Sequence, residues 1–362
     1  MNKESRRDRP FPGSDVSGDR ELSQSMAEGR ASSGPEYPLR QRFDGVARIA
    51  CFFTVIFVGI LGLDRTITFG LRHVKTGQYG VSNRIMQGKV NAQLVITGSS
   101  RALSHYDPRI LETKTGLSGF NLGRNGSQTD MQLALFRTYL EHNKNLRVVL
   151  HNLDGFSFEA TRQVYDPGQY VPYLYDRQLY DPLRRINPAV WKSRYLPLYG
   201  YVVEDMSFSW MLGLAALVGW SPREEYFLGF NPRSKAWTDE FQNFKAGNSN
   251  GISWPIDPEG VQGIQEIIHL CRQEGFQLIF VYSPEYSEMQ KLTRNRSEVF
   301  ARLREMADRA DIPFWDYSDW RFAGETRYFQ NSQHLNADGA ELFSADLGDR
   351  LKAYLALSHP AR

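Results

Sequence analysis

Cysteine is scarce in this chain of 362 residues, which contains only Cys51 and Cys271. Cys51 lies in an apolar run and Cys271 in a distant helical pattern, so we do not expect a disulfide framework. No group of Cys and His residues has the spacing of a zinc site, and no Gly-rich loop of the GxxxxGKS/T type is present to bind phosphate. We therefore expect neither a metal ion nor any other cofactor.

An excess of one charge is also missing, because 43 basic residues are balanced by 41 acidic ones. The formal net charge of +2 gives no long-range field that would attract nucleic acid, so no nucleic-acid partner is expected. By contrast, 41% of the residues are hydrophobic and 13% are aromatic. This content is enough to bury the core of one large domain or of two ordinary ones.

The N-terminal residues divide into a polar tail and an apolar run. Residues 1–42 are rich in Arg, Ser, Gly, Asp, Glu and Pro. We expect them to form a disordered cytoplasmic tail, because they cannot bury enough apolar surface to offset the entropy of ordering. Residues 43–66 are predicted to form a transmembrane anchor, since every residue from Ile49 to Leu63 is apolar, small or Thr.

The length and flanks of this run leave two alternatives, a buried core helix and a cleavable signal peptide. The uncharged stretch is a little shorter than the roughly 20 residues that cross a bilayer core, although Arg48 and Arg65 can extend it by snorkelling. Cleavage is disfavoured because the preceding tail is long and Asp64-Arg65-Thr66 offers no site of small residues. Positive charges near the two ends of the run are balanced, so they do not set its orientation.

After a linker of residues 67–92, short apolar runs alternate with helical patterns over residues 93–356. This alternation predicts a three-layer α/β fold with a mostly parallel, flavodoxin-like sheet. The expected strands cover residues 93–97, 119–122, 146–153, 276–282 and 312–317. The expected helices cover residues 128–142, 259–274, 288–310 and 336–355.

Residues 155–255 interrupt the alternation and are predicted to be an insertion that acts as a lid or substrate subdomain. Its run 206–220 carries no charge. A second span there would separate Ser100 from His334 across the bilayer, so we expect a buried helix, with a re-entrant or surface-docked segment as the alternatives. Several aromatic residues of the insertion either line a sugar-binding groove or pack its core, namely Tyr170, Tyr173, Tyr175, Trp191, Tyr195 and Trp237.

The strongest local signal for chemistry is LVITGSSRA, residues 94–102, where an apolar strand runs into Ser100. A serine after the first parallel strand lies where α/β sheets bind ligands, and a helix start beside it offers N–H groups to an oxyanion. A serine hydroxyl needs a base to take its proton. Of the seven histidines, His334 is the best placed, because it directly precedes the last helix. A tight turn and a helix cap are the structural alternatives for these two residues.

Two further blocks end strands of the same sheet. In GFNLGRNGSQTD, residues 119–130, Gly123 can present an N–H to an oxyanion or simply form a turn. In HNLDGFSF, residues 151–158, Asn152 or Asp154 can point into the same crevice.

Taken in order, these four blocks resemble the SGNH/GDSL hydrolase superfamily, over residues 93–355 without the insertion. They are most similar to its membrane-anchored branch, which includes alginate O-acetylation proteins and the protein that assists D-alanyl transfer to teichoic acid. The resemblance implies Ser100 as the nucleophile, His334 as the base, and the backbone N–H groups of Ser100 and Gly123 as oxyanion donors. It also implies Asn152 as a third donor.

Two departures from the family pattern leave parts of this site open. Asn152-Leu153-Asp154 does not match the Gly-x-Asn-Asp block cleanly, which leaves the third donor in question. Asn331 stands where the family has the Asp of Asp-x-x-His. The site is therefore a Ser–His dyad with Asn331, a triad completed by another acid such as Asp316 or Asp319, or a weakened enzyme.

Three more residues near these blocks are expected to contact substrate: Arg101, Asn125 and Asp154. For Arg101 the alternative is simple solvation at the surface.

The predicted function is that of a membrane-anchored serine esterase or O-acyltransferase acting on acyl esters of a cell-envelope or exported polysaccharide. We expect a single-pass protein of the inner or plasma membrane, with the catalytic domain on the periplasmic side and a membrane acyltransferase as a candidate partner. The alternatives are a catalytically silent polysaccharide-binding or scaffold protein and a tethered cytoplasmic lipid esterase. No sequence motif specifies the acyl group or its acceptor. None specifies the choice between hydrolysis and transfer, or the oligomeric state.

Overall fold

The computed structural model describes residues 39–358, apart from residues 205–207, 224–225, 235 and 239. Most of the predicted tail, residues 1–38, lies outside the described residues. The chain divides into two units, Met1–Thr54 and Val55–Arg362. The first unit is described only through the beginning of one helix, and the second contains the whole α/β domain.

A five-stranded sheet with all strands parallel forms the centre of the second unit, in the order β2-β1-β3-β4-β5. This order confirms the predicted α/β fold with a flavodoxin-like sheet. All five strands lie within the predicted ranges: β1 Leu94–Thr97, β2 Gly119–Asn121, β3 Val148–Asn152, β4 Gln277–Tyr282 and β5 Phe314–Asp316.

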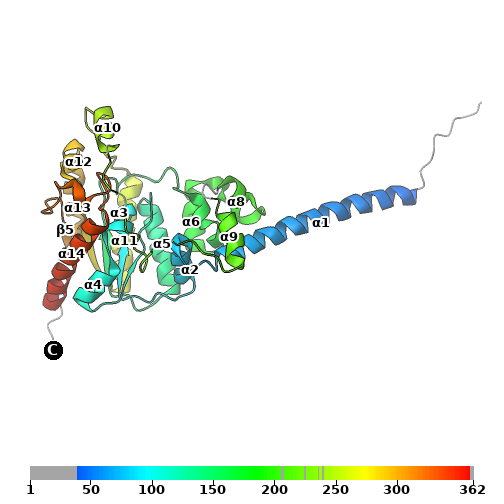
Figure 1. Ribbon diagram of the computed structural model, residues 1–362, viewed down its shortest axis with the longest axis horizontal. Helices are drawn as coiled ribbons and strands as arrows, with labels where there is room; N and C mark the ends of the chain where they lie inside the picture. The colour runs from blue at the N-terminus through cyan, green and yellow to red at the C-terminus, as the bar shows by residue number, and fades with distance from the viewer. Residues whose placement is uncertain (1–38, 205–207, 224–225, 235, 239, 359–362) are drawn as a thin grey trace, which may run out of the picture. The chain divides into compact units, whose positions relative to one another are not determined.

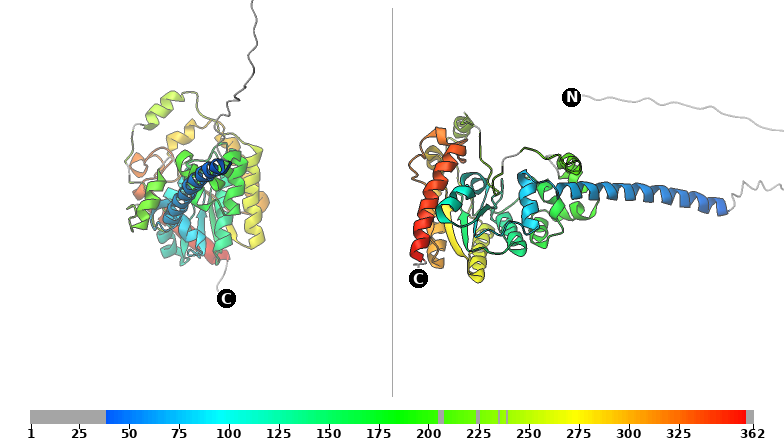
Figure 2. Two further views of the ribbon diagram at one scale, coloured as in Figure 1. Left: turned by 90° about the vertical axis from the view of Figure 1, so that its right-hand side faces the viewer. Right: turned by 60° about the horizontal axis from the view of Figure 1, so that its bottom comes forward.

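Helices cover both faces of the sheet, as the predicted three layers require (Figures 1 and 2). Alternate strand residues face opposite sides, so Val95 and Val149 belong to one apolar core and Leu94 and Leu150 to the other. The first core is closed by α2 Gly77–Met86, α5 Thr129–His142, α11 Pro258–Glu274 and α13 Arg296–Ala310. The second is closed by α3 Ser100–His105, α4 Pro108–Thr115 and α14 Ala337–Ser358.

Two segments differ from their predicted structure. Residues 67–92 were expected to be a linker, but they contain α2, whose Val81 and Ile85 are buried in the first core. The expected helix 288–310 is broken into α12 Ser287–Leu292 and α13. The break forms because the backbone there pairs with Ile252, which donates to the C=O of Leu292 and accepts from the N–H of Arg294. A tertiary contact thus overrides a continuous helical pattern.

The insertion forms a helical subdomain whose apolar core is shared with the N-terminal helix α1 Leu39–Leu71, with α2 and with α5. It comprises two short 3-10 helices, η1 Pro167–Tyr173 and η2 Pro188–Val190, and the helices α6 Arg177–Ile186, α7 Trp191–Tyr195, α8 Tyr199–Val203, α9 Ser209–Leu217 and α10 Glu240–Gly247. Tyr170 and Tyr173 lie in this core, which fits the packing alternative, whereas Tyr175, Trp191 and Tyr195 are exposed.

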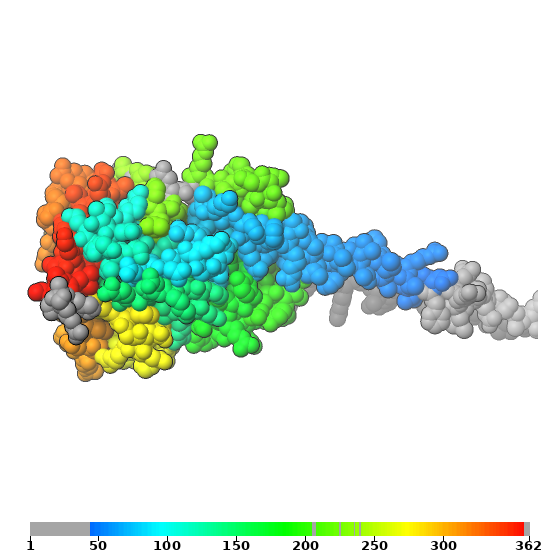
Figure 3. Space-filling view, turned by 90° about the horizontal axis from the view of Figure 1, so that it is seen from below, coloured from blue at the N-terminus to red at the C-terminus, as the bar shows by residue number. Residues whose placement is uncertain are grey.

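The N-terminal helix α1 runs from Leu39 to Leu71, and its part from Asp44 onward is long and apolar enough to cross a membrane. In the second unit, Ile67 and Leu71 of α1 are buried in the core of the insertion. This part of α1 is flanked by the green surface of the insertion in the space-filling view (Figure 3). The helix is therefore longer than the predicted span of residues 43–66.

Candidate active site

Ser100 is positioned by a sharp turn between β1 and α3. Gly98 has a φ of 141°, and a Cβ there would lie 2.9 Å from the Cβ atoms of Ala102 and Asn152, so only glycine fits. Ser99 caps the helix, since its side chain accepts from the N–H of Arg101 at 3.2 Å. Ser100 is the first residue of α3, at the carboxyl end of β1, where the strand order reverses between β1 and β3.

The structure brings Ser100 and His334 together across 234 residues of sequence. The Oγ of Ser100 lies 2.7 Å from the Nε2 of His334, and the Nδ1 of His334 lies 2.9 Å from the Oδ1 of Asn331. Both Ser100 and His334 are partly exposed.

The hydrogen bonds of Asn331 fix the tautomer of His334. The side-chain atom that faces the imidazole also accepts the backbone N–H groups of Gln333 and His334, each at 3.0 Å, so this atom is the amide oxygen. The Nδ1 of His334 must then carry the proton that it donates to Asn331. The unprotonated Nε2 consequently faces the hydroxyl of Ser100, which is the arrangement that a general base requires.

The two acids considered as third members of a triad are engaged elsewhere or exposed. Asp316 accepts from the guanidinium of Arg304 at 2.8 Å and from the N–H of Ser318 at 3.0 Å. Asp319 is exposed. A triad completed by either residue is therefore not present, and the neutral Asn331 occupies the third position.

The surroundings of His334 favour the uncharged imidazole. Burial, then the positive charges of Arg233 and Arg101, lower the pKa of His334 from 6.5 to about 3. Arg233 belongs to the insertion and is tied to the site at two points: its Nη2 donates to Asn125 Oδ1 at 2.6 Å, and its C=O accepts the N–H of Ala337 at 2.9 Å. The imidazole is therefore uncharged at physiological pH, with Nε2 free of a proton, and it is a weaker base than an ordinary imidazole.

This lowered pKa predicts an unusual pH profile. A base must be unprotonated to act, so kcat/KM for an acyl ester should stay constant as the pH falls below 6.5 and should decline only as it approaches about 3. The measurement is kcat/KM for an acetyl ester from about pH 8 down to about pH 4.5, within the range in which the protein remains folded. A decline centred near pH 6.5 would contradict the environment described for His334.

Two of the three expected oxyanion donors are occupied by neighbouring side chains. The N–H of Gly123 donates to Asn121 Oδ1 at 2.8 Å, and the Nδ2 of Asn152 donates to Asp154 Oδ1 at 3.1 Å. The N–H of Ser100, by contrast, lies at the start of α3, where the first N–H groups have no partner within the helix.

Gly123 serves instead for close packing. A Cβ there would lie 2.3 Å from the backbone nitrogen of Leu103, so Gly123 allows the loop after β2 to touch α3. Asn121 joins the same two segments, because its Nδ2 donates to the C=O of Ala102 at 2.7 Å and of Tyr106 at 3.0 Å. The expectation that Gly123 and Asn152 aim donors at the substrate is thus not met in this conformation.

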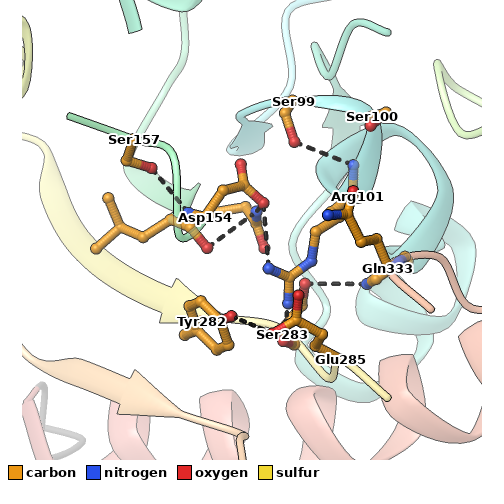
Figure 4. A network of polar contacts seen from close by, with 12 residues as sticks. Ser99, Ser100, Arg101, Asp154, Ser157, Tyr282, Ser283, Glu285 and Gln333 are labelled. Carbon is orange, nitrogen blue, oxygen red and sulfur yellow. Dashed lines mark hydrogen bonds and ion pairs between the residues drawn. The ribbon is translucent and has the colours of Figure 1, made fainter. Parts of the chain in front are cut away.

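Arg101 and Asp154 form a buried pair behind Ser100 (Figure 4). The Nη1 of Arg101 lies 3.3 Å from Asp154 Oδ1, its Nη2 donates to the C=O of Ser283, and its guanidinium lies 4.4 Å from the ring centre of Tyr282. Burial raises the pKa of Asp154, while the charge of Arg101 opposes that rise.

The exposed fractions are 2% for Arg101 and 0% for Asp154. Their burial corrects the expectation of substrate contact, and it also corrects the alternative that Arg101 is solvated at the surface. The third expected substrate residue, Asn125, is partly exposed and holds Arg233 beside the site.

His105 is a positioning residue that the sequence did not reveal. Its Nε2 accepts the N–H of Leu335 at 3.0 Å, so its Nδ1 carries the proton and donates to Ser283 Oγ at 2.9 Å. Burial is the main cause that lowers the pKa of His105. The neutral ring therefore links the end of α3, which begins with Ser100, to the residue after His334. No local motif marks such a contact, because its partners are remote in sequence.

Comparisons with known proteins do not assign an activity to this chain. No protein-family model matches the sequence. No curated protein matches it either. Among solved structures, the chain is similar to a Bacteroides fragilis protein named as a candidate acylhydrolase, with 11% sequence identity, a TM-score of 0.34, and coverage of 72% of this chain and 87% of that one. At such low identity and TM-score, the activity of this chain must be inferred from its own site.

Proposed function

We propose that the chain is a membrane-anchored serine esterase or O-acyltransferase that acts on acyl esters of a cell-envelope or exported polysaccharide. The observation that carries this proposal is the 2.7 Å hydrogen bond between Ser100 Oγ and His334 Nε2, together with the tautomer that Asn331 imposes. A hydroxyl held against an unprotonated imidazole nitrogen is the arrangement of an activated nucleophile.

In the proposed reaction, Ser100 Oγ attacks the acyl carbonyl carbon as His334 Nε2 takes its proton. The carbonyl oxygen becomes an oxyanion beside the N–H of Ser100. The imidazolium then gives its proton to the leaving alcohol oxygen as the C–O bond to it breaks, which leaves an acyl ester on Ser100. Water or a sugar hydroxyl next attacks this ester through the same base, giving hydrolysis or transfer.

Arg233 has opposite effects on the two charges that form in this reaction. Its guanidinium disfavours the imidazolium, as the lowered pKa of His334 shows, but attracts the oxyanion. Among the residues that the structure describes, Arg233 forms no ion pair with a carboxylate. Because the N–H groups of Gly123 and Asn152 are engaged, the guanidinium of Arg233 remains as a source of positive potential beside the N–H of Ser100.

An aromatic cluster next to His334 supports a sugar as the acyl donor or acceptor. Trp237, from the insertion, packs against Tyr286 with 4.8 Å between ring centres. The N–H of Tyr286 donates at 3.0 Å to the C=O of Ser332, in the loop that carries His334. The partly exposed Trp237 offers a flat apolar face of the kind on which sugar rings pack.

Replacing Trp237 by Ala should therefore raise KM for an acetylated oligosaccharide by about tenfold, the equivalent of one lost aromatic contact of about 1.4 kcal/mol. KM for a small chromogenic ester should change less than twofold. Both constants are measured on the full chain in detergent, with Trp220→Ala as the matched control because Trp220 is exposed on another part of the insertion. Equal effects on the two substrates would remove Trp237 from sugar recognition.

The membrane-related parts of the proposal follow from α1. A helix of this length and apolarity would hold the protein at the inner or plasma membrane, with Ser100 and His334 on the periplasmic side. A membrane acyltransferase would be the partner that delivers acyl groups across the bilayer.

The function is tested with the full-length chain in detergent and a chromogenic acetyl ester, beside Ser100→Ala and His334→Ala. We expect both variants to lose activity by at least about a thousandfold, to the background of the uncatalysed reaction. Addition of an oligosaccharide acceptor then separates the two outcomes, because a transferase would place the acetyl group on the sugar and an esterase would release acetate. Equal rates for the wild type and Ser100→Ala would contradict the proposal.

A silent polysaccharide-binding or scaffold protein is the second candidate. Asn331 in place of an acid, together with the engaged N–H groups of Gly123 and Asn152, favours it. Oligosaccharide binding that survives both Ser100→Ala and His334→Ala, with no acyl group ever found on Ser100, would decide for this candidate.

A further inference from the structure

Exposed apolar side chains are concentrated in one part of the insertion. Ten large apolar side chains within residues 191–220 are exposed, and together they are here called the α7–α9 surface. They are Trp191, Tyr195, Leu196, Val202, Val203, Phe208, Met211, Leu217, Val218 and Trp220. Elsewhere after α1, the described residues include only four, at Tyr165, Tyr175, Phe244 and Leu357. A soluble surface does not normally gather so many large apolar groups unless they meet a partner.

The helix α9 makes this surface unusual. The uncharged run 206–220 was expected to form a buried helix, with residues 206 and 207 lying outside the described residues. In α9 only Ser209 and Gly213 are buried, whereas Met211 is 51% exposed and Leu217 is 44% exposed. Partly buried residues of α9, such as Trp210 and Leu214, pack against the core of the insertion, so α9 is covered on one face only. The exposed face of a helix that is apolar on all sides is stable in contact with lipid or with an apolar partner.

The α7–α9 surface lies directly beside the end of the apolar stretch of α1. The N–H of Leu198 donates to Asp64 Oδ1 at 2.9 Å, and the hydroxyl groups of Tyr201 and Thr68 lie 2.8 Å apart. Further along, α1 and α9 touch through glycines, because a Cβ on Gly70 would lie 1.8 Å from the C=O oxygen of Gly213.

These contacts begin at Asp64, where the side chains of α1 change from exposed to partly buried. Before Asp64, apolar side chains such as Phe57 and Val58 are more than half exposed, as expected for a helix surrounded by lipid. From Asp64 onward, one face of α1 packs on the insertion and buries Ile67 and Leu71. The insertion therefore meets α1 at the level at which a spanning helix would leave the bilayer core.

Basic and aromatic side chains border the α7–α9 surface in the pattern of a membrane interface. Lys192 lies 5.8 Å from the ring centre of Tyr199, and Arg194 lies 5.3 Å from that of the exposed Tyr195. Tryptophan and tyrosine are enriched at the headgroup level of bilayers, where long basic side chains also reach lipid phosphates.

We propose that the α7–α9 surface docks on the bilayer that α1 enters, with Trp220 and Val218 among the lipid acyl chains and Lys192 and Arg194 at the headgroups. This inference rests on the proposed membrane anchoring. Docking would hold the insertion, and with it Arg233 and Trp237, at a fixed height above the membrane.

The test uses the full-length chain with Cys51→Ser and a single introduced cysteine that carries a fluorescent NBD group. The probe position is Val218→Cys, and the matched control is Leu357→Cys, because the two residues are 85% and 83% exposed. Native Cys271 is 1% exposed, and labelling of the parent without an introduced cysteine checks that it does not react. The proteins are reconstituted in vesicles of phosphatidylcholine and phosphatidylglycerol.

We expect a shallow doxyl-labelled lipid to quench position 218 at least about threefold more strongly than position 357, and aqueous iodide to do the reverse. Quenching of both positions by iodide alone would overturn the proposal, and so would a position 218 shielded from both quenchers, which would indicate a protein partner or a second copy. Release of the protein from the vesicles by alkaline carbonate would contradict the anchoring itself. If the protein stays in the vesicles but iodide alone quenches position 218, the docking is contradicted and the anchoring is not.

Discussion

Replacement of Asn331 by Asp is expected to raise the turnover number for an acyl ester by about tenfold or more, because the opposite exchange in a serine protease lowers turnover about 10⁴-fold. The carboxylate would keep the three hydrogen bonds that Asn331 Oδ1 accepts and would add a negative charge beside His334 Nδ1. That charge stabilises the imidazolium formed as Ser100 loses its proton. It should also raise the pKa of His334 and move the acidic limb of the pH profile upward.

The measurement compares kcat and the pH dependence of kcat/KM for Asn331→Asp and the wild type. Asn331→Ala is the control, since it removes the one oxygen that accepts from the imidazole and from the two backbone N–H groups, and it should lower kcat. An Asn331→Asp variant with unchanged kcat and pH profile would show that no imidazolium forms at His334 in the slow step.

Replacement of Arg101 by Met is expected to lower the free energy of unfolding by about 3–5 kcal/mol, the usual cost of removing one partner from a buried ion pair. The pair side chains are 3% and 0% exposed, so Asp154 would keep a desolvated charge without its partner. Glu285, which is 6% exposed, would lose the same nearby positive charge. Denaturant unfolding of the full chain in mild detergent, followed by intrinsic fluorescence, measures the change.

A second variant separates the lost charge from lost packing. In Arg101→Met combined with Asp154→Leu, no carboxylate is left unpaired at that position, so the loss should be smaller than in Arg101→Met alone. If the double variant loses as much stability as the sum of the two single variants, Arg101 and Asp154 are not energetically coupled.

The sheet could be predicted because each strand is a short apolar run, and its parallel order follows from the helices between the runs. The runs ending at Thr97 and Asn152 were placed within two residues, since periodicity is a local property. The broken helix 288–310 was missed because its break depends on Ile252, which is remote in sequence. The exposed face of α9, with Met211 and Leu217, was missed for a similar reason, since composition alone does not distinguish a core from another apolar medium.

The pairing of Ser100 with His334 could be predicted from the sequence. Ser100 directly follows an expected strand, and His334 directly precedes the last expected helix. The tautomer of His334 could not, because it depends on two backbone N–H groups that bind Asn331. Arg233 was missed for a different reason. It comes from the insertion, outside every motif, and only the folded chain places it beside Asn125.

The most direct test of the central claim is covalent labelling of the full-length wild type with a fluorophosphonate, which reacts with a serine activated by a neighbouring base. Peptide mass spectrometry should find a single adduct at Ser100, lost in Ser100→Ala and at least about a hundredfold slower to form in His334→Ala. An adduct that forms equally fast in His334→Ala, or a wild type that forms no adduct at Ser100, would contradict the proposed roles of Ser100 and His334.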